Sequence, residues 1–321
     1  MKTTVGIVLL AMLCACTSDD PSRSQVDGPE LQVTRAQFEQ AYTCRGELTN
    51  SRRDPVLITP AFSTDEESFG WNYLRQLPAL GIPVCSLSLP DGGFGDLQLA
   101  AEYVVHAVRR MHADSGRKVV LFGHQHGPLN ELWALSFWPD LPARVSSFIS
   151  LATPYQGTTA AQGTCGLTGF CPPAVWQIAT GSAFLAALAR QPLPAGPAYT
   201  SITTLYDELI LPQPEASTLR GGTTIVLQDL CPRRPIEHFT ILADHLSYRL
   251  VLDALDHPGQ PADPARLPAD ICSGPLYLPG VGDPHNTVGA LGGVVGFLTG
   301  FAGAIPLQGV AAEPELRSYA R

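Results

Sequence analysis

Short apolar runs alternate with helical patterns through most of this 321-residue chain. Strand-like runs occur at 55–59, 82–90, 118–122, 146–152, 200–206 and 223–229. Helical patterns occur at 97–111, from the turn after 122 to Trp138, at 174–190 and at about 244–255. Strands that alternate with helices form crossovers that leave neighbouring strands parallel, with helices on both faces of the sheet. The pattern therefore predicts an α/β fold with a mostly parallel sheet, in one domain over residues 41–321.

Composition and charge narrow the classes of function. Hydrophobic residues make up 45% of the chain, which is enough to bury a sizeable core. The formal charge is −9 and there is no basic stripe, which argues against a nucleic-acid partner. His124 and His126 are two apart on a turn with no third ligand close in the sequence, so we expect no metal site. No sequence motif indicates a cofactor.

The N-terminus has the pattern of a bacterial lipoprotein signal. A positive start and a short apolar run from Val5 to Leu13 precede Leu13-Cys14-Ala15-Cys16, which fits a lipobox. We expect a signal peptide at 1–15, a lipid on Cys16 and a flexible tether over 16–40. The protein would then be exported and anchored to the cell envelope, at the outer membrane or cell surface. An ordinary secretory signal is the alternative.

Six further cysteines suit an exported protein. An even number in an oxidising compartment suggests three disulfides, and none of the spacings is Cys-x-x-Cys. Their number alone leaves the pairing open. They are Cys44, Cys85, Cys165, Cys171, Cys231 and Cys272.

The uncharged stretch from Val288 to Ala311 admits two interpretations. Its glycines and Pro306 favour a packed, loosely helical C-terminal segment over a membrane span.

The turn after the strand at 118–122 raises the main functional question. It reads Gly123-His124-Gln125-His126-Gly127, between a predicted strand and a predicted helix. Serine hydrolases of the α/β type place their nucleophile on such a turn, in the pattern G-x-S-x-G. The glycines permit the strained backbone and close packing, while the serine projects over the sheet. Gln125 stands in the place of the serine, and its amide cannot attack an acyl carbon.

Two later residues fit the remaining members of a catalytic triad, which follow in the order acid, then histidine. Asp207 comes directly after the strand at 200–206, and His238 lies between the next strand and the next helix. By position alone, a solvated loop carboxylate and an ordinary loop histidine are equally good interpretations.

From about Cys44 to its end, the chain resembles the secreted bacterial lipases related to fungal lipase B of the Candida antarctica type. The matching segments are WNYLRQLPALGIPVC (71–85), LWALSFWPD (132–140), PAVWQIATGSAFLAAL (173–188), LYDELILPQ (205–213), the stretch 231–272, which contains RRPIEHF, and EPELRSYAR (313–321). The resemblance implies an α/β-hydrolase fold and a triad completed by Asp207 and His238. It also implies the disulfides Cys44–Cys85 and Cys231–Cys272, which leaves Cys165–Cys171 as a local staple.

The same resemblance identifies two departures from the family pattern. The family's G-H-S-Q-G becomes GHQHG, so Gln125 replaces the serine nucleophile. Its oxyanion loop, P-G-T, becomes Pro60-Ala61-Phe62, so the hydroxyl donor is lost. Phe62 and His126 are then the oxyanion-loop positions, with only backbone N–H groups to offer.

Three functional interpretations follow. The first is a pseudo-lipase that binds a lipid, an ester-like small molecule or a protein partner, because losing the nucleophile costs roughly 10⁶ in turnover. The second is a hydrolase or other acyl-processing enzyme in which Asp207 and His238 activate water, with Gln125 orienting it. The third moves the nucleophile to Ser63 or Ser150, neither of which lies on a strand–helix turn.

Overall fold

The computed structural model describes residues 28–62, 72–281 and 284–321, and its centre is a seven-stranded sheet. The strand order is β1-β3-β2-β4-β5-β6-β7. All neighbouring pairs are parallel except β1 and β3. The strands are β1 (Tyr42–Arg45), β2 (Val56–Thr59), β3 (Val84–Leu87), β4 (Val119–His124), β5 (Val145–Leu151), β6 (Ala198–Thr203) and β7 (Thr223–Val226). The predicted mostly parallel sheet is confirmed.

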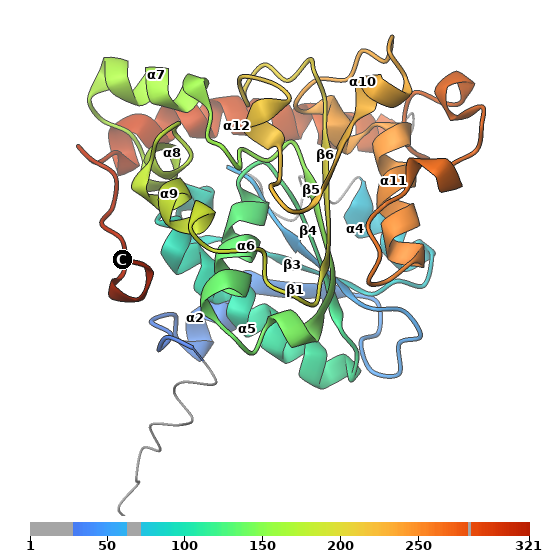
Figure 1. Cartoon of the computed structure of the whole chain (residues 1–321), viewed down its shortest axis with the longest axis horizontal. Coiled ribbons are helices and arrows are strands. Elements are labelled where there is room, and N and C mark those ends of the chain that lie inside the picture. Colours follow the sequence, from blue (N-terminus) through green and yellow to red (C-terminus); the bar gives the residue numbers. More distant parts are fainter. Residues whose placement is uncertain (1–27, 63–71, 282–283) are drawn as a thin grey trace, which may run out of the picture.

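Helices cover both faces of this sheet (Figure 1). They are α2 (Arg35–Ala41), α4 (Tyr73–Ala79), α5 (Leu97–Ser115), α6 (Gly127–Phe137), α7 (Thr159–Thr168), α8 (Pro173–Gln177), α9 (Ala183–Ala189), α10 (Leu227–Leu230), α11 (His245–Asp256) and α12 (Pro284–Gln308). Side chains of β4 alternate between two apolar clusters: Leu121 packs with α5 and α6, while Val120 and Phe122 pack with α4 and α11. The central strands are buried on both sides, as their continuous apolar runs predict.

Several predicted elements differ at their ends. The helix predicted at 174–190 is two helices, because Gly181 has a φ of 84° and Ser182 caps a new helix, accepting the Leu185 N–H. The strand predicted at 223–229 ends at Val226, where α10 begins, and the one predicted at 200–206 ends at Thr203. Strand β1 and helix α4 were not predicted, since both are too short to show a clear periodicity.

The predicted flexible tether over residues 16–40 is wrong in its second half. Val33 and Phe38 are buried, and the Glu102 carboxylate of α5 accepts the Val33 N–H at 2.8 Å. The indole of Trp138 donates to the Pro29 carbonyl at 3.0 Å. Residues 29–41 therefore pack on the domain, because two apolar side chains in this polar stretch find a place against α5. The signal peptide at 1–15, Cys16 and the rest of the tether lie outside the described residues.

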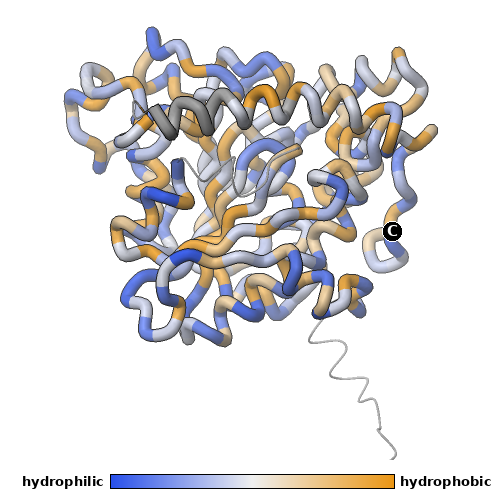
Figure 2. Tube along the Cα trace, turned by 180° about the vertical axis from the view of Figure 1, so that it is seen from behind, coloured by the Kyte–Doolittle hydropathy of each residue, from blue (hydrophilic) through white to orange (hydrophobic). Residues whose placement is uncertain are grey.

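Helix α12 crosses the molecule above the carboxyl ends of the strands, in both views (Figures 1 and 2). It contains no charged residue. Ala304 is buried, while Val295 and Leu298 are exposed. The predicted C-terminal segment is thus a regular helix that covers the edge of the sheet where β4 ends. Among the described residues, no helix has both the length and the hydropathy needed to cross a membrane.

Three disulfides join the cysteines in the pairs implied by the resemblance. Cys44–Cys85 connects β1 to β3, at positions that are partners in the strand register. Cys231–Cys272 connects the end of α10 to a segment after α11. Cys165–Cys171 closes a short loop at the end of α7.

Candidate active site

The turn between β4 and α6, residues 123–127, is a strained strand-to-helix elbow. Gln125 has a φ of 56°, a conformation that residues other than glycine seldom adopt and that costs roughly 1–3 kcal/mol. Its backbone N–H donates to the carbonyl of Leu151, at the end of β5, with an N···O distance of 3.0 Å. Gln125 therefore lies at the centre of a strained strand-to-helix turn, the kind of turn that carries the nucleophile in α/β-hydrolases.

The two glycines of the elbow are required by packing. A Cβ atom on Gly127 would lie 2.3 Å from the backbone oxygen of Thr59 in β2. A Cβ atom on Gly123 would lie 2.9 Å from the ring of Pro128, in the first turn of α6. Both distances are shorter than any side chain tolerates, so α6 could not begin this close to the sheet with larger residues.

The side chain of Gln125 turns back into the protein. It is 3% exposed, and its Oε1 atom accepts the backbone N–H of Phe62 with a long N···O distance of 3.5 Å. In α/β-hydrolases, one oxyanion donor is an N–H of a loop that follows a neighbouring strand, and the other is the N–H of the residue after the nucleophile. The amide oxygen of Gln125 thus lies against the first of these donors, in the loop after β2.

Four aromatic rings close this end of the site. The Phe62 ring stacks on the His126 ring, with centroids 4.0 Å apart, and on the Phe94 ring at 4.8 Å. Phe301 of α12 completes the cluster, 6.3 Å from Phe62 and 6.1 Å from Phe94. Burial lowers the pKa of His126 to about 3, so this imidazole is neutral. The rings offer no hydroxyl donor for an oxyanion.

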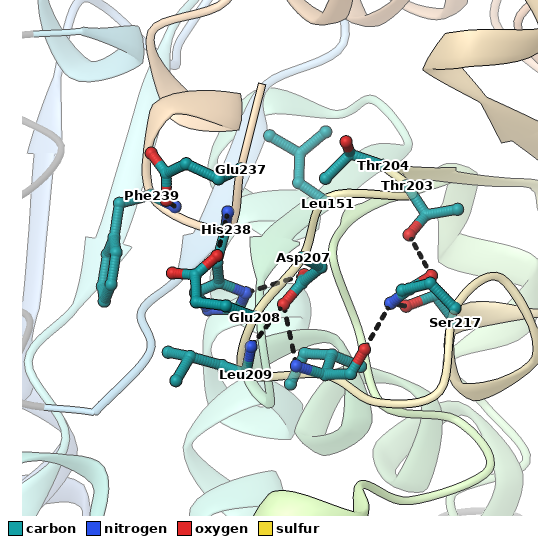
Figure 3. A network of polar contacts seen from close by, with 12 residues as sticks. Leu151, Thr203, Thr204, Asp207, Glu208, Leu209, Ser217, Glu237, His238 and Phe239 are labelled. Carbon is teal, nitrogen blue, oxygen red and sulfur yellow. Dashed lines mark hydrogen bonds and ion pairs between the residues drawn. The ribbon is translucent and has the colours of Figure 1, made fainter. Parts of the chain in front are cut away.

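The second half of the site is an acid–base pair, Asp207 and His238. Nδ1 of His238 lies 2.8 Å from Oδ2 of Asp207, and both side chains are buried (Figure 3). The other carboxylate oxygen, Oδ1, accepts the backbone N–H groups of Leu209 at 2.9 Å and Ile210 at 2.7 Å. A carboxylate can only accept hydrogen bonds, so the hydrogen between Oδ2 and Nδ1 belongs to the imidazole. The proton of a neutral imidazole therefore resides on Nδ1, and Nε2 is a hydrogen-bond acceptor.

More carboxylates surround the pair. Oε2 of Glu208 accepts the backbone N–H of His238 at 3.3 Å, and the Glu237 carboxylate accepts the N–H groups of Phe239 and Thr240. Burial raises the pKa of Glu208, and the nearby charge of Glu237 raises it further. Two carboxyl groups therefore lie next to His238 besides Asp207, and burial favours the neutral form of Glu208.

His124 connects the elbow with the acid–base pair. Its Nε2 atom lies 3.0 Å from the carbonyl oxygen of His238, and the two rings are 4.6 Å apart. Burial lowers the pKa of His124 well below its ordinary value, so it is a neutral donor to this carbonyl. His124 and His126 have separate partners, and no group of three metal-ligating side chains occurs in the part of the chain that the structure describes.

The structure thus gathers the predicted positions into two groups. Gln125, Phe62 and His126 contact one another directly or through shared partners, and Asp207 contacts His238. Ser150 does not join them: it is buried in β5, where its hydroxyl receives a hydrogen bond from Tyr155 at 2.6 Å. Ser63 lies outside the described residues.

Two parts of the site were not predicted from the sequence. Phe94 and Phe301 come from segments far apart along the chain and meet only in the fold. His124 was noted only as half of a metal motif. Its position directly before Gln125, at the end of a strand facing the loop of His238, was a signal for its actual contact.

Comparisons with known proteins agree with this geometry. No protein-family model matches the chain. It is 28% identical over 260 residues to lipase B of Pseudozyma antarctica, covering 76% of this chain and 75% of that protein.

Two solved structures show the same fold. The crystal structure of Aspergillus fumigatus lipase B superposes with a TM-score of 0.82 at 24% identity, over 92% of this chain and 74% of the other. The mature Bacillus licheniformis lipase BlEst2 superposes with a TM-score of 0.52 at 17% identity, over 67% of this chain and 97% of the other. The sheet, the elbow and these likenesses together make the chain a lipase-related protein of the α/β-hydrolase fold.

Proposed function

We propose that this protein is a pseudo-lipase, a lipase-related binding protein that forms no seryl ester intermediate and is held at the cell envelope by a lipid on Cys16. The observation that carries the proposal is the position of Gln125. It stands at the elbow, and its amide oxygen accepts the Phe62 N–H. One residue thus removes the nucleophile and occupies an oxyanion donor.

The expected losses in turnover support the loss of seryl chemistry. Removal of a triad nucleophile lowers turnover by roughly 10⁶, and removal of one oxyanion donor by roughly 10²–10³. These effects are not additive, but the first alone is decisive. The ligand we propose is a lipid or other ester-like small molecule, because the chain is similar in sequence to a lipase.

A second function is favoured by the acid–base pair itself. The 2.8 Å contact between Asp207 and His238 is what a general base needs, and Nε2 of His238 has no partner among the described residues. Water activated there, and oriented by the Gln125 amide, would hydrolyse an ester without a covalent intermediate.

Ester turnover separates the two functions. The purified protein is compared with its His238→Ala variant on short and long acyl esters, with Ser150→Ala as the matched control. The pseudo-lipase proposal expects equal, background rates for all three proteins. A parent rate well above that of His238→Ala would establish the water-based reaction instead. A loss confined to Ser150→Ala would indicate a relocated nucleophile. Mass spectrometry of lipid that copurifies with the parent then identifies the ligand.

A further inference from the structure

A small cavity of about 70 Å³ opens between α6, α9 and the segment that precedes β7. Four of its lining side chains belong to the apolar cluster that includes α5 and α6: Leu132, Tyr155, Leu188 and Leu219. The Tyr155 hydroxyl already donates to Ser150 at 2.6 Å, so it is not free to donate to a ligand. None of the lining residues belongs to the elbow or to the acid–base pair. The cavity is therefore a site of its own, with apolar walls.

Two loops that border this cavity are joined by hydrogen bonds. The backbone N–H of Gln156 donates to the Ala216 carbonyl at 3.0 Å, and its Nε2 atom donates to the Thr218 carbonyl at 3.2 Å. Gly221 has a φ of 84°, which lets the chain turn into β7 directly after Arg220. The loop after β5 and the segment before β7 therefore form one border, which carries the polar residues of the cavity.

Arg220 is the only charged residue among those that line the cavity. Its side chain is exposed, and its guanidinium donates one N–H to Oε1 of Gln156, a neutral acceptor. None of the ion pairs between described residues involves Arg220. A guanidinium has five N–H donors in a planar fork that matches the two oxygens of a carboxylate. Arg220 can therefore receive an anionic group at the mouth of the cavity.

The surrounding sequence favours an anion, although the chain as a whole has a formal charge of −9. Residues 141–206, which supply most of the lining, contain no Asp or Glu, and within 216–228 the only charged residue is Arg220. Glu131 precedes the lining residue Leu132 in α6, but burial raises the pKa of its carboxyl well above the ordinary value and favours the neutral form. An anion at Arg220 thus meets an attractive charge, and these segments place no ionised carboxylate against it.

The volume of the cavity limits the size of the ligand. A water-sized group needs about 10–15 Å³ of such space, so about 70 Å³ holds roughly five or six non-hydrogen atoms. The apolar walls suit an alkyl tail, and the guanidinium suits a carboxylate at its end. A long acyl chain exceeds the space.

We infer that this cavity binds the anion of a short-chain carboxylic acid, with the alkyl tail between α6 and α9 and the carboxylate on the guanidinium of Arg220. The inference goes beyond the proposed function and does not depend on it, because none of the contacts involves Gln125, Asp207 or His238.

The test compares three small probes at neutral pH: pentanoate, pentanamide and acetate. Pentanamide keeps the shape of pentanoate without its charge, and acetate keeps the charge without the tail. Dissociation constants are measured by NMR titration of the purified full-length protein with labelled leucine methyl groups. Pentanoate is expected to bind roughly fivefold more tightly than pentanamide, since the ion pair is exposed. Acetate, which lacks three methylene groups, should bind at least about tenfold more weakly than pentanoate.

Two variants at exposed positions test the two halves of the site, with a matched control for each. Arg220→Gln keeps a polar side chain and removes the charge, so pentanoate and pentanamide should bind equally; Arg35→Gln, in α2, should leave their ratio unchanged. Ala189→Trp places a large ring at a lining position and should weaken both probes by about tenfold or more. Ala186→Trp, also exposed on α9 but not lining the cavity, should bind both probes as the parent does. Thermal unfolding confirms that each variant is folded.

Several results would overturn the inference. They are the absence of saturable pentanoate binding, equal affinity of the parent for pentanoate and pentanamide, and pentanoate binding that is unchanged in Arg220→Gln or in Ala189→Trp. Pentanoate binding that is lost in His238→Ala but kept in Arg220→Gln would place the ligand at the acid–base pair, and so overturns the inference as well. The proposed function is tested separately, by ester turnover.

Discussion

The amide oxygen of Gln125 accepts the backbone N–H of Phe62 at 3.5 Å, and in our proposal these two residues stand at the nucleophile and oxyanion-donor positions. In a serine hydrolase, the first position would carry the attacking oxygen and the second would hold the oxyanion. The contact satisfies a buried donor with a neutral acceptor. It explains how the loop after β2 keeps its backbone polar group paired without a substrate.

Replacing Gln125 with serine should restore a reactive hydroxyl. The elbow backbone is already strained as required, and Asp207 orients His238 to act as the base. We expect Gln125→Ser to react with a fluorophosphonate probe and with activated esters, where the parent does not, as measured by labelling and mass spectrometry. Gln125→Ala is the control and should stay unlabelled. A folded Gln125→Ser protein that never takes the label would contradict our placement of the nucleophile position.

A second change should raise the rate of that variant at the expense of stability. Adding Ala61→Gly and Phe62→Thr supplies a hydroxyl donor to the oxyanion, worth roughly 10²-fold in turnover. Phe62 is 1% exposed and contacts three rings, so its loss should lower the free energy of unfolding by about 3 kcal/mol. Ester kinetics and urea unfolding measure the two effects. Tyr206→Thr, at a 51% exposed position, is the control and should change stability little; an equal loss in both would argue against a packed ring cluster.

The stability of the protein should fall in mild acid because of buried histidines. The pKa of His126 in the folded state is about 3, below the ordinary histidine value of about 6.5. Between these values the unfolded chain binds a proton that the folded protein excludes. This group therefore contributes full stability above about pH 6.5 and loses it as the pH falls, by about 2 kcal/mol between pH 8 and pH 5.

Urea unfolding of the parent and of His126→Gln at these two pH values measures this contribution. The variant should lose less stability on acidification than the parent. The pKa of His124 is lowered in the same direction, so some acid sensitivity should remain in the variant. Identical losses in the two proteins would show that His126 is not buried in its neutral form.

The disulfides should differ in how much they contribute to the free energy of unfolding. Cys231–Cys272 spans 41 residues and Cys165–Cys171 spans 6. In the chain-entropy model these loops correspond to about 4 and about 2 kcal/mol of stability. Paired Cys→Ala replacements, followed by urea unfolding, test this order. The unreduced parent is the control: thiol titration should find no free thiol among the six cysteines. Two reactive thiols, or a larger loss for the short loop, would contradict the prediction.

In our proposal, a lipid on Cys16 anchors the protein to the membrane. A Cys16→Ser variant should leave the membrane fraction, because it cannot receive the lipid. Cys14→Ser, two residues earlier and inside the predicted signal, is the matched control and should remain with the membrane. If Cys16→Ser stays in the membrane fraction, the uncharged stretch from Val288 to Ala311 becomes the candidate for attachment.

Local patterns predicted most of the sheet, while the assignment of the acid–base pair came from the resemblance to lipases. The apolar run at 118–122 becomes β4, and the order of Asp207 and His238 along the chain matches their contact. The predicted helix boundaries were wrong where a single residue determines them, as at Gly181.

Long-range packing was not predictable. The contact of Phe62 with Phe301 depends on how α12 crosses the sheet, which no local periodicity encodes. The packing of residues 29–41 was also not predictable. Their polar composition suggests a tether, and only the folded structure shows that Val33 and Phe38 pack in the same apolar cluster as α5.

The 2.3 Å approach of a virtual Gly127 Cβ to β2 also affects how such sequences should be interpreted. Any chain that starts α6 this close to the sheet needs glycine there, whether or not it catalyses a reaction. The glycine pair of a G-x-x-x-G turn is therefore diagnostic of architecture, and only the middle residue is informative about chemistry. Genome searches that score the glycines would group inert and active members together. Such sequences can instead be sorted by two residues: the middle residue of the turn, and the residue that corresponds to Phe62 in the loop after β2. This would separate candidate binding proteins from candidate hydrolases before any assay.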